Sequence, residues 1–159
     1  MTKLKIIPLL FSVGICFLAA AIGSAFTAGA IDTWYATLNK PFFSPPNWIF
    51  GPVWTLLYLM MGISLYLVWI TKIDKKTKRQ AITFFFIQLG FNALWSILFF
   101  GLKSPSAALL GIIVLWIAIC LTFRNFLRVS NLAAWLLIPY LAWVSFATIL
   151  NLSILLLNR

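Results

Sequence analysis

Five long apolar segments, separated by short polar connections, dominate the sequence and limit the folds open to it. They are predicted at residues 6–26, 48–71, 81–101, 106–127 and 132–157. A bilayer's hydrocarbon core is about 30 Å thick, so about 20 apolar residues in a helix cross it. Hydrophobic residues make up 64% of the chain, whereas soluble domains contain roughly half. The sequence therefore predicts an all-α membrane protein, a single five-helix domain over residues 1–159, with the first span retained as a signal anchor.

The basic residues fall in the connections, and their distribution predicts an orientation. Nine of the twelve Lys and Arg residues lie on one side of a five-span arrangement, namely Lys3, Lys5, Lys72, Lys75, Lys76, Lys78, Arg79, Arg124 and Arg128. The positive-inside rule then places the N-terminus in the cytoplasm and the C-terminus outside, in a bacterial cell membrane. The net charge of +10 is thereby explained as a topology signal, and no nucleic-acid partner is expected. Binding of lipid headgroups by residues 72–79 is a weaker alternative.

Residues 41–58, which read PFFSPPNWIFGPVWTLLY, form the one stretch whose composition membrane burial does not explain. Its prolines predict a stiff, non-helical segment over residues 41–46, followed by a helix capped by Ser44 or Asn47. Together with the preceding residues it makes a connection of about twenty residues, 27–46, and loops of that length often act as lids. Trp48, Trp54 and Tyr58 are expected along one side of the helix that follows.

Aromatic and polar residues recur at helical spacing in the other spans. Gln88, Asn92 and Trp95 share one face of the third span, and Trp143, Ala147 and Asn151 share one face of the fifth. With a rise of 1.5 Å per residue, Trp54, Trp95 and Asn151 each lie about 9 Å below the outer end of their span, and Trp143 about 21 Å. These depths predict a single outward-opening pocket with residues 27–46 as roof and Trp143 near the floor.

Two features of the spans allow more than one interpretation. Small residues between Gly14 and Ala25 favour close helix packing, and a smooth wall for a flat ligand is the alternative. For Gln88 or Asn92 taken singly, a hydrogen bond between helices is the alternative to ligand contact. Pro139 is expected to free the carbonyl of Trp135 and bend the fifth helix.

The residue inventory excludes most chemistry. The chain has no His and only two acidic residues, Asp32 and Asp74, which excludes catalytic triads and metal sites built from His and carboxylates. Cys16 and Cys120 fall inside predicted spans, where thiols pack as small hydrophobic groups. No metal and no built-in cofactor are expected. What remains is binding of a mainly apolar ligand, with electron exchange between an indole and a photoexcited ligand as the one reaction open to such a pocket.

Four separated motifs carry a resemblance to a known family. They are Trp34-Tyr35, then Pro41-x-x-Ser-Pro-Pro-x-Trp48-x-Phe-Gly-Pro-Val-Trp54-Thr-x-x-Tyr58, then Gln88-Leu-x-x-Asn92-x-x-Trp95, and finally Pro139-Tyr-Leu-Ala-Trp143-x-x-Phe-Ala147-x-x-x-Asn151. In order and spacing they resemble the TspO/translocator-protein family, whose members are also called tryptophan-rich sensory proteins and peripheral-type benzodiazepine receptors. The match covers essentially the whole chain.

The resemblance implies a five-helix bundle, commonly a homodimer, that binds porphyrins such as protoporphyrin IX, sterols in some members, and synthetic drug-like ligands. It implies a pocket closed by the first loop and lined at positions matching Trp54, Asn92, Trp95, Trp143, Ala147 and Leu150. Two departures bear on ligand choice. The residues after Asn151 lack the sterol-recognition pattern of animal members, and Ala25 stands where some members have an Arg that would pair with a ligand carboxylate.

The sequence thus predicts a membrane receptor or sensor that binds porphyrins and hydrophobic drug-like molecules in an outward-facing aromatic pocket. The expected ligand-binding residues are Trp48, Trp54, Tyr58, Gln88, Asn92, Trp95, Trp143, Ala147, Leu150 and Asn151. Two alternatives stay open. One is an enzyme that degrades protoporphyrin IX in light, with Trp54 and Trp143 as catalytic residues, and the other is a transporter of tetrapyrroles or lipids.

Overall fold

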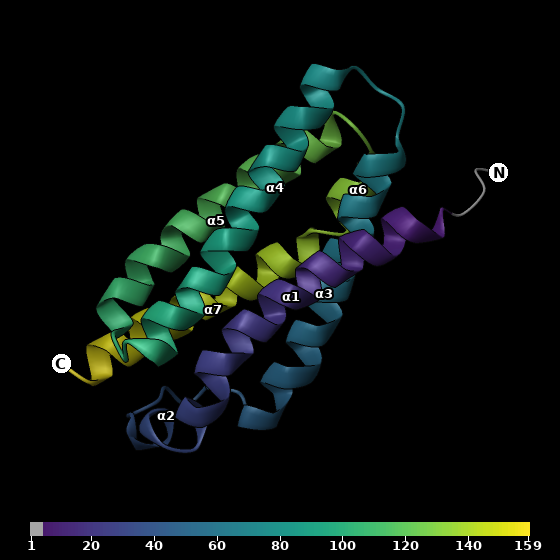
Figure 1. Ribbon diagram of the computed structural model, residues 1–159. Helices are drawn as coiled ribbons and strands as arrows, with labels where there is room; N and C mark the ends of the chain where they lie inside the picture. The colour runs from purple at the N-terminus through teal and green to yellow at the C-terminus, as the bar shows by residue number, and fades with distance from the viewer. Residues whose placement is uncertain (1–4) are drawn as a thin grey trace.

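The computed structural model describes residues 5–159, and every regular element in that range is a helix (Figure 1). The elements are α1 (Ile6–Ile31), α2 (Trp34–Thr37), α3 (Asn47–Ile70), α4 (Lys75–Ser96), the π-helix η1 (Ile97–Gly101), α5 (Pro105–Leu127), α6 (Asn131–Trp135) and α7 (Ile138–Leu157). Five helical stretches within the described range, with α4 and η1 forming one and α6 and α7 another, are long and apolar enough to cross a membrane. The prediction of an all-α, five-span membrane protein is therefore confirmed.

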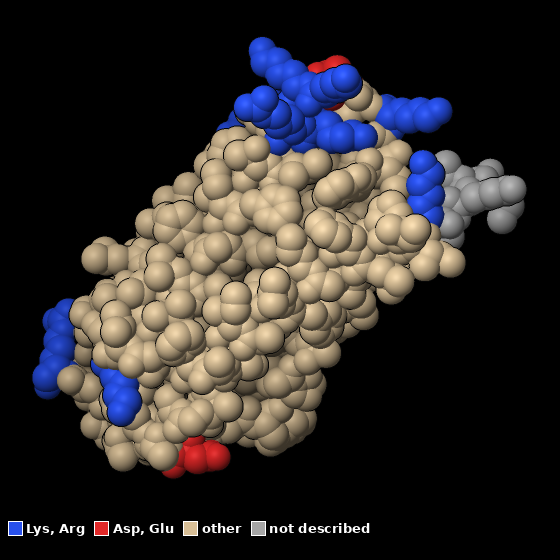
Figure 2. Space-filling model, viewed as in Figure 1, with Lys and Arg blue, Asp and Glu red and all other residues tan. Residues whose placement is uncertain are grey.

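The helices form an elongated bundle in which α1 packs on α3 and α4, and α5 packs on α4 and α7. Helix α1 begins at one end of the bundle and α7 finishes at the opposite end (Figure 1). We call these the basic end, which holds residues 71–74 and 128–130, and the loop end, which holds residues 32–46. Figure 2 shows Lys and Arg side chains gathered at the basic end, with an uncharged surface between the two ends on this face. That pattern fits an apolar belt between two aqueous surfaces.

Helices α1 and α3 approach each other closely at Gly62. A Cβ atom added to Gly62 would lie 2.7 Å from the Cα atom of Val13, closer than two such atoms approach in proteins. Glycine is needed here because any side chain would push the two helices apart. Beyond this contact, toward the loop end, α1 and α3 leave room for a cavity.

The connection between the first two spans is shorter and more helical than expected. Helix α1 continues to Ile31, five residues past the predicted boundary at residue 26, and residues 34–37 form the short helix α2. The expected caps of α3 are wrong, because Pro46 occupies the N-cap position and no side chain hydrogen-bonds there. The ring of Pro46 fixes its φ, at −57°, and its ψ of 143° is extended, so the prolines at 45 and 46 set the entry of the chain into the helix without a polar cap. A lid function of this segment stays a prediction.

Two further span boundaries differ from the prediction. Helix α4 begins six residues earlier than expected because the Asp74 carboxylate accepts a hydrogen bond of 2.9 Å from the Thr77 backbone N–H and caps it. The fifth span is interrupted between α6 and α7, with Pro139 in the first turn of α7. Proline is tolerated in the first turn of a helix because the backbone N–H that it lacks has no hydrogen-bond partner within the helix at that position. The bend expected at Pro139 thus takes the form of a two-residue interruption of the helix, at residues 136 and 137.

Candidate functional site

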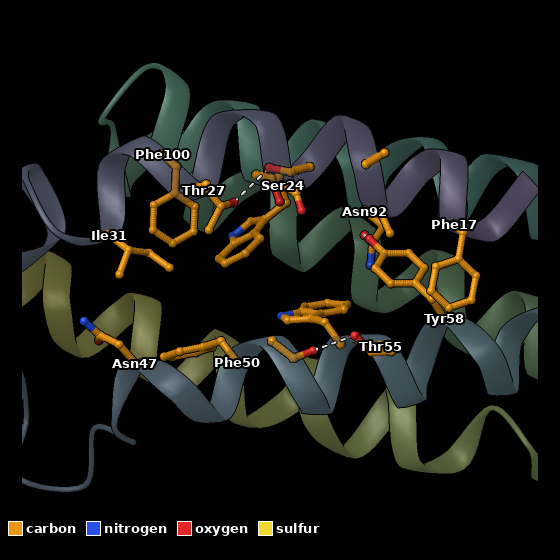
Figure 3. A pocket seen from close by; sticks show the side chains of 18 residues that line it. Phe17, Ser24, Thr27, Ile31, Asn47, Phe50, Thr55, Tyr58, Asn92 and Phe100 are labelled. Atoms are coloured by element: carbon orange, nitrogen blue, oxygen red, sulfur yellow. Dashed lines mark hydrogen bonds between the residues drawn. The ribbon is translucent and has the colours of Figure 1, made fainter.

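A cavity of about 500 Å³ lies between α1, α3 and the end of α4 with η1, in the half of the bundle near the loop end (Figure 3). Its volume falls in the range of small-molecule sites, about 300–1,000 Å³. We call it the large cavity; it is lined by Phe17, Ala20, Ala21, Gly23, Ser24, Thr27, Ala28, Ile31, Asn47, Phe50, Gly51, Trp54, Thr55, Tyr58, Asn92, Trp95, Ser96 and Phe100. Exposed residues on the facing edges of α1 and α3, such as Ser24 and Thr55, show that it opens to the surface between these helices.

The polar groups of the large cavity are uncharged. Its lining, all within the described residues, has no Lys, Arg, Asp or Glu. Thr27 Oγ1 donates to the Gly23 carbonyl and Thr55 Oγ1 to the Gly51 carbonyl, each over 2.9 Å (dashed lines in Figure 3). Because each hydroxyl proton is held by its own helix, the two oxygens face each other from α1 and α3 as acceptors only. The site is therefore suited to a neutral, mainly apolar body, and a hydrogen-bond donor on that body can be met by these two acceptors.

A buried hydrogen-bond network closes the inner end of the large cavity. The Tyr58 hydroxyl donates to Asn92 Oδ1, and Asn92 Nδ2 donates to the Tyr140 hydroxyl over 2.8 Å. All three side chains are buried, and they tie α3, α4 and α7 together. Tyr140 was not among the predicted site residues, although it lies inside the Pro139-Tyr-Leu-Ala-Trp143 motif. The side-chain oxygen and nitrogen of Asn92 are both used in these hydrogen bonds. In this structure Asn92 therefore links helices, which was the alternative to ligand contact in the sequence analysis.

A second, smaller cavity of about 30 Å³ lies on the other side of Trp54, against α7. Its lining comprises Tyr35, Phe50, Trp54, Trp95, Phe99, Phe100, Trp143, Ala147, Leu150, Asn151 and Ile154. Asn151 holds one wall in place, because its Oδ1 accepts from Trp95 Nε1 over 3.2 Å and its Nδ2 donates to the Pro105 carbonyl over 2.9 Å. The volume has room for about one water molecule, so this small cavity has no room for a ring in its present form.

The loop end of the small cavity is closed by Tyr35 of α2. Its ring packs at 6.5 Å from that of Phe50, and the Lys40 ammonium lies 4.7 Å from its centroid. Burial raises the pKa of the Tyr35 hydroxyl. The chain after α2 is tied to the end of α7, because the Asn39 N–H donates to Asn158 Oδ1 and Asn158 Nδ2 donates to the Asn39 carbonyl, both over 2.9 Å.

Comparison with known proteins places these residues in a family. Residues 12–157 match the TspO/MBR family. The chain belongs to this family. It is 53% identical to the tryptophan-rich protein TspO of Archaeoglobus fulgidus over 136 residues, 86% of this chain and 87% of that protein. It is 46% identical to TspO of Chlorobaculum tepidum over 154 residues, 97% and 98% of the two chains. It is 40% identical to the human translocator protein over 136 residues, 84% of this chain and 80% of that one.

The structure brings most of the predicted site residues of this TspO/MBR chain to the two cavities, but it does not form one pocket. Tyr58 and Asn92 line only the large cavity, and Trp54 and Trp95 line both. Four others, Trp143, Ala147, Leu150 and Asn151, line only the small one. The expectation of a single pocket with Trp143 near its floor is therefore wrong for this conformation. The reason is the aromatic rings, which fill the space where the two halves would join.

Two predicted residues lie outside both cavities. Trp48 is 72% exposed. It lies six residues before Trp54, which is about 240° around the helix, so the two do not share a side of α3 as expected. Gln88 is buried, with Nε2 3.9 Å from the Met61 sulfur and its Oε1 without a hydrogen-bond partner in the described part of the chain. Contact of either residue with a ligand stays a prediction.

The wall contributed by α1 is the part of the site that the motifs did not indicate. Ala20, Ala21 and Ser24 line the large cavity, while a Cβ atom at Gly23 would lie 3.1 Å from the Ser96 hydroxyl oxygen. Both interpretations of the small residues are therefore realised, close packing on α4 and a smooth wall on the side of α3. The run of small residues in the first span was the signal for this wall.

Proposed function

We propose that this TspO/MBR chain is a membrane receptor that binds a planar, mainly apolar ligand, such as protoporphyrin IX or a drug-like ring system, in the large cavity. One observation carries the proposal: small side chains of α1 face the aromatic side chains of α3 across an open slot. Figure 3 shows this opposition, with Ser24 and Thr27 on one side and Phe50 and Thr55 on the other. A slot with one smooth wall and one aromatic wall suits a flat ring better than a globular ligand.

The absence of charge in the lining dictates how such a ligand would lie. An ionised carboxylate is costly to bury without a partner, so the apolar ring enters the cavity and any carboxylates stay at its mouth. We use this word for the part of the opening between α1 and α3 that lies nearest the loop end. Among the lining residues Asn47 and Ile31 are nearest the loop connection, and the Asn47 amide offers a hydrogen-bond donor there. The outward direction of this mouth is the orientation that the basic residues predict.

The relatives' names support a receptor or carrier more than an enzyme. They are called tryptophan-rich sensory protein in Cereibacter sphaeroides and translocator protein in Homo sapiens. Light-driven degradation of protoporphyrin by Trp54 and Trp143 gains no support from these names or from the geometry, and we do not propose it. Transport stays an alternative, while the homodimer, the lipid contacts and the cytoplasmic N-terminus stay predictions.

A titration with protoporphyrin IX tests the proposal. We expect saturable quenching of tryptophan fluorescence and a shift of the porphyrin absorbance band in the dark, for the full chain in lipid nanodiscs. Ser24→Phe puts a ring into the slot and should weaken binding by about tenfold or more, about 1.4 kcal/mol. Gly14→Phe is the matched control, because Gly14 also lies on α1, lines neither cavity and has no atom within 4 Å of a Cβ placed there. Equal affinities for the two variants would overturn the proposal.

A further inference from the structure

The two cavities are separated by four aromatic side chains, Phe50, Trp54, Trp95 and Phe100, which line both. Side chains of α1 reach only the large cavity and side chains of α7 reach only the small one. A ligand that contacts α1 and α7 together must therefore displace part of this aromatic partition. A ligand that stays in the large cavity need not.

The two tryptophans of the partition are held very differently. Trp95 donates its indole N–H to Asn151, which is itself bonded to the Pro105 carbonyl, and its ring stacks on Phe99 at 5.3 Å. The Trp54 indole N–H makes no hydrogen bond to any residue from 5 to 159. Its ring only packs, at 5.6 Å from Tyr58 and 6.2 Å from Tyr140. Of the two indoles, that of Trp54 can rotate without breaking a hydrogen bond.

We propose that Trp54 is the residue that sets which ligand size the site accepts. With the ring as observed, a flat bicyclic ligand fits in the large cavity and contacts α1, α3 and α4. Rotation of the Trp54 indole joins the two cavities, and a tetrapyrrole macrocycle then reaches the α7 wall formed by Trp143, Ala147 and Leu150. This inference rests on the proposed function for the identity of the wide ligand, but the partition itself exists without any ligand.

The arrangement has a kinetic consequence. If the open arrangement is only a minor population in the free protein, both the apparent affinity and the observed association rate for a wide ligand are reduced by that fraction. Removing the ring removes this reduction, because the cavities are then joined permanently. A narrow ligand has no such dependence, since its cavity is present in both arrangements.

Stopped-flow binding with two probes tests this assignment in nanodiscs. The wide probe is protoporphyrin IX and the narrow probe is the fluorescent bicycle 2-naphthol. Trp54→Ala should raise the association rate of protoporphyrin about tenfold, whereas 2-naphthol, which loses the Trp54 ring from the wall of its cavity, should associate no faster than with the wild type. Trp135→Ala is the matched control, because Trp135 is 61% exposed and lies outside both cavities. Unchanged protoporphyrin association in Trp54→Ala would overturn the proposal.

Ala147→Leu is the complementary experiment, because it places extra atoms in the small cavity alone. It should weaken protoporphyrin binding by about tenfold while leaving the 2-naphthol affinity as in the wild type. Equal loss for both probes would mean that the two cavities already act as one. Loss for neither would mean that the ligand does not reach α7.

A ligand-free measurement separates failure of this proposal from failure of the proposed function. In protein carrying 5-fluorotryptophan, Trp54→Phe assigns the Trp54 resonance among the eight tryptophans. Fluorine relaxation dispersion should show microsecond-to-millisecond exchange for Trp54 and none for Trp95. A Trp54 resonance without exchange would overturn the assignment whether or not protoporphyrin binds. Exchange at Trp54 in a protein that does not bind protoporphyrin would refute the proposed function and leave the movable partition in place.

Discussion

The same pair of helices, α1 and α3, is packed tightly toward the basic end and held apart toward the loop end. At the tight end, the Gly62 backbone lies against Val13, and the rings of Phe11 and Trp69 meet edge to face at 5.7 Å. At the open end, the facing residues are small on α1 and aromatic on α3, and the large cavity lies between them. The difference teaches that a binding slot inside a membrane bundle needs a rigid contact elsewhere along the same helices, because lipid supplies no hydrophobic force to hold them together.

The largest effect is expected from breaking the tight end. Gly62→Leu forces a side chain into the Val13 backbone, and overpacking of this kind costs about 3 kcal/mol of the free energy of unfolding. Thermal unfolding in detergent micelles measures the loss. Gly14→Leu is the control, because no atom lies within 4 Å of a Cβ placed there. If both variants unfold at the wild-type temperature, the α1–α3 contact does not hold the bundle together.

Ser24→Phe should give the opposite pattern and so sharpens the comparison. It fills the slot and lowers ligand affinity as described above, but the thermal unfolding temperature should stay at the wild-type value because Ser24 is exposed. A large drop in that temperature would show that the open end is packed as critically as the tight end.

An intermediate effect is expected from Asn92, which lies where the two regions meet. Asn92→Leu removes the hydrogen bonds to Tyr58 and Tyr140, and two such bonds between membrane helices are worth about 1 kcal/mol together. We expect that loss in thermal unfolding and weaker protoporphyrin binding in the same variant. Loss of binding at unchanged stability would instead assign Asn92 to the ligand rather than to the bundle.

The smallest effect concerns pH at the basic end. Hydrogen bonds from the backbone N–H and side chain of Thr77 hold the pKa of the exposed Asp74 carboxyl below its usual value. A carboxyl whose pKa is lower in the folded state stabilises the fold above its unfolded pKa, and this contribution is lost as the pH falls through the folded pKa. The protection factors of the amides in the first turn of α4, which correct for the intrinsic pH dependence of hydrogen exchange, should therefore fall at strongly acidic pH in the wild type and be insensitive to pH in Asp74→Asn. Ligand affinity should depend neither on this change of pH nor on the Asp74→Asn substitution.

The spans were predictable from the sequence because apolar length is set by membrane thickness, and the boundaries that failed have local causes. Residues 27–31 continue α1 although they are weakly apolar, and Asp74 starts α4 before its apolar part begins. That Trp54, Trp95 and Asn151 lie at one level of the bundle was predictable as well, since it depends only on helical rise, and all three line the small cavity. Their division between two cavities was not, because it depends on how each helix is rotated about its axis and on which rings fill the space between.

Trp48 and Tyr140 illustrate that limit. Both belong to motifs of the family, but helical rotation turns Trp48 outward and brings Tyr140 under Trp54. Tyr140 could be assigned to the site only from the structure, which shows that its hydroxyl accepts a hydrogen bond from Asn92. The α1 wall had a signal in the run of small residues, and the sequence alone could not separate a ligand wall from a packing surface because both require the same side chains.

The most direct test of the account is an experimental structure of the chain with protoporphyrin IX bound in nanodiscs. The account predicts the macrocycle between α1 and α3, with the Trp54 ring rotated from its place between Tyr58 and Tyr140 and the α7 wall in contact with the ligand. A macrocycle bound elsewhere on the bundle, with the slot empty and Trp54 in place, would contradict it.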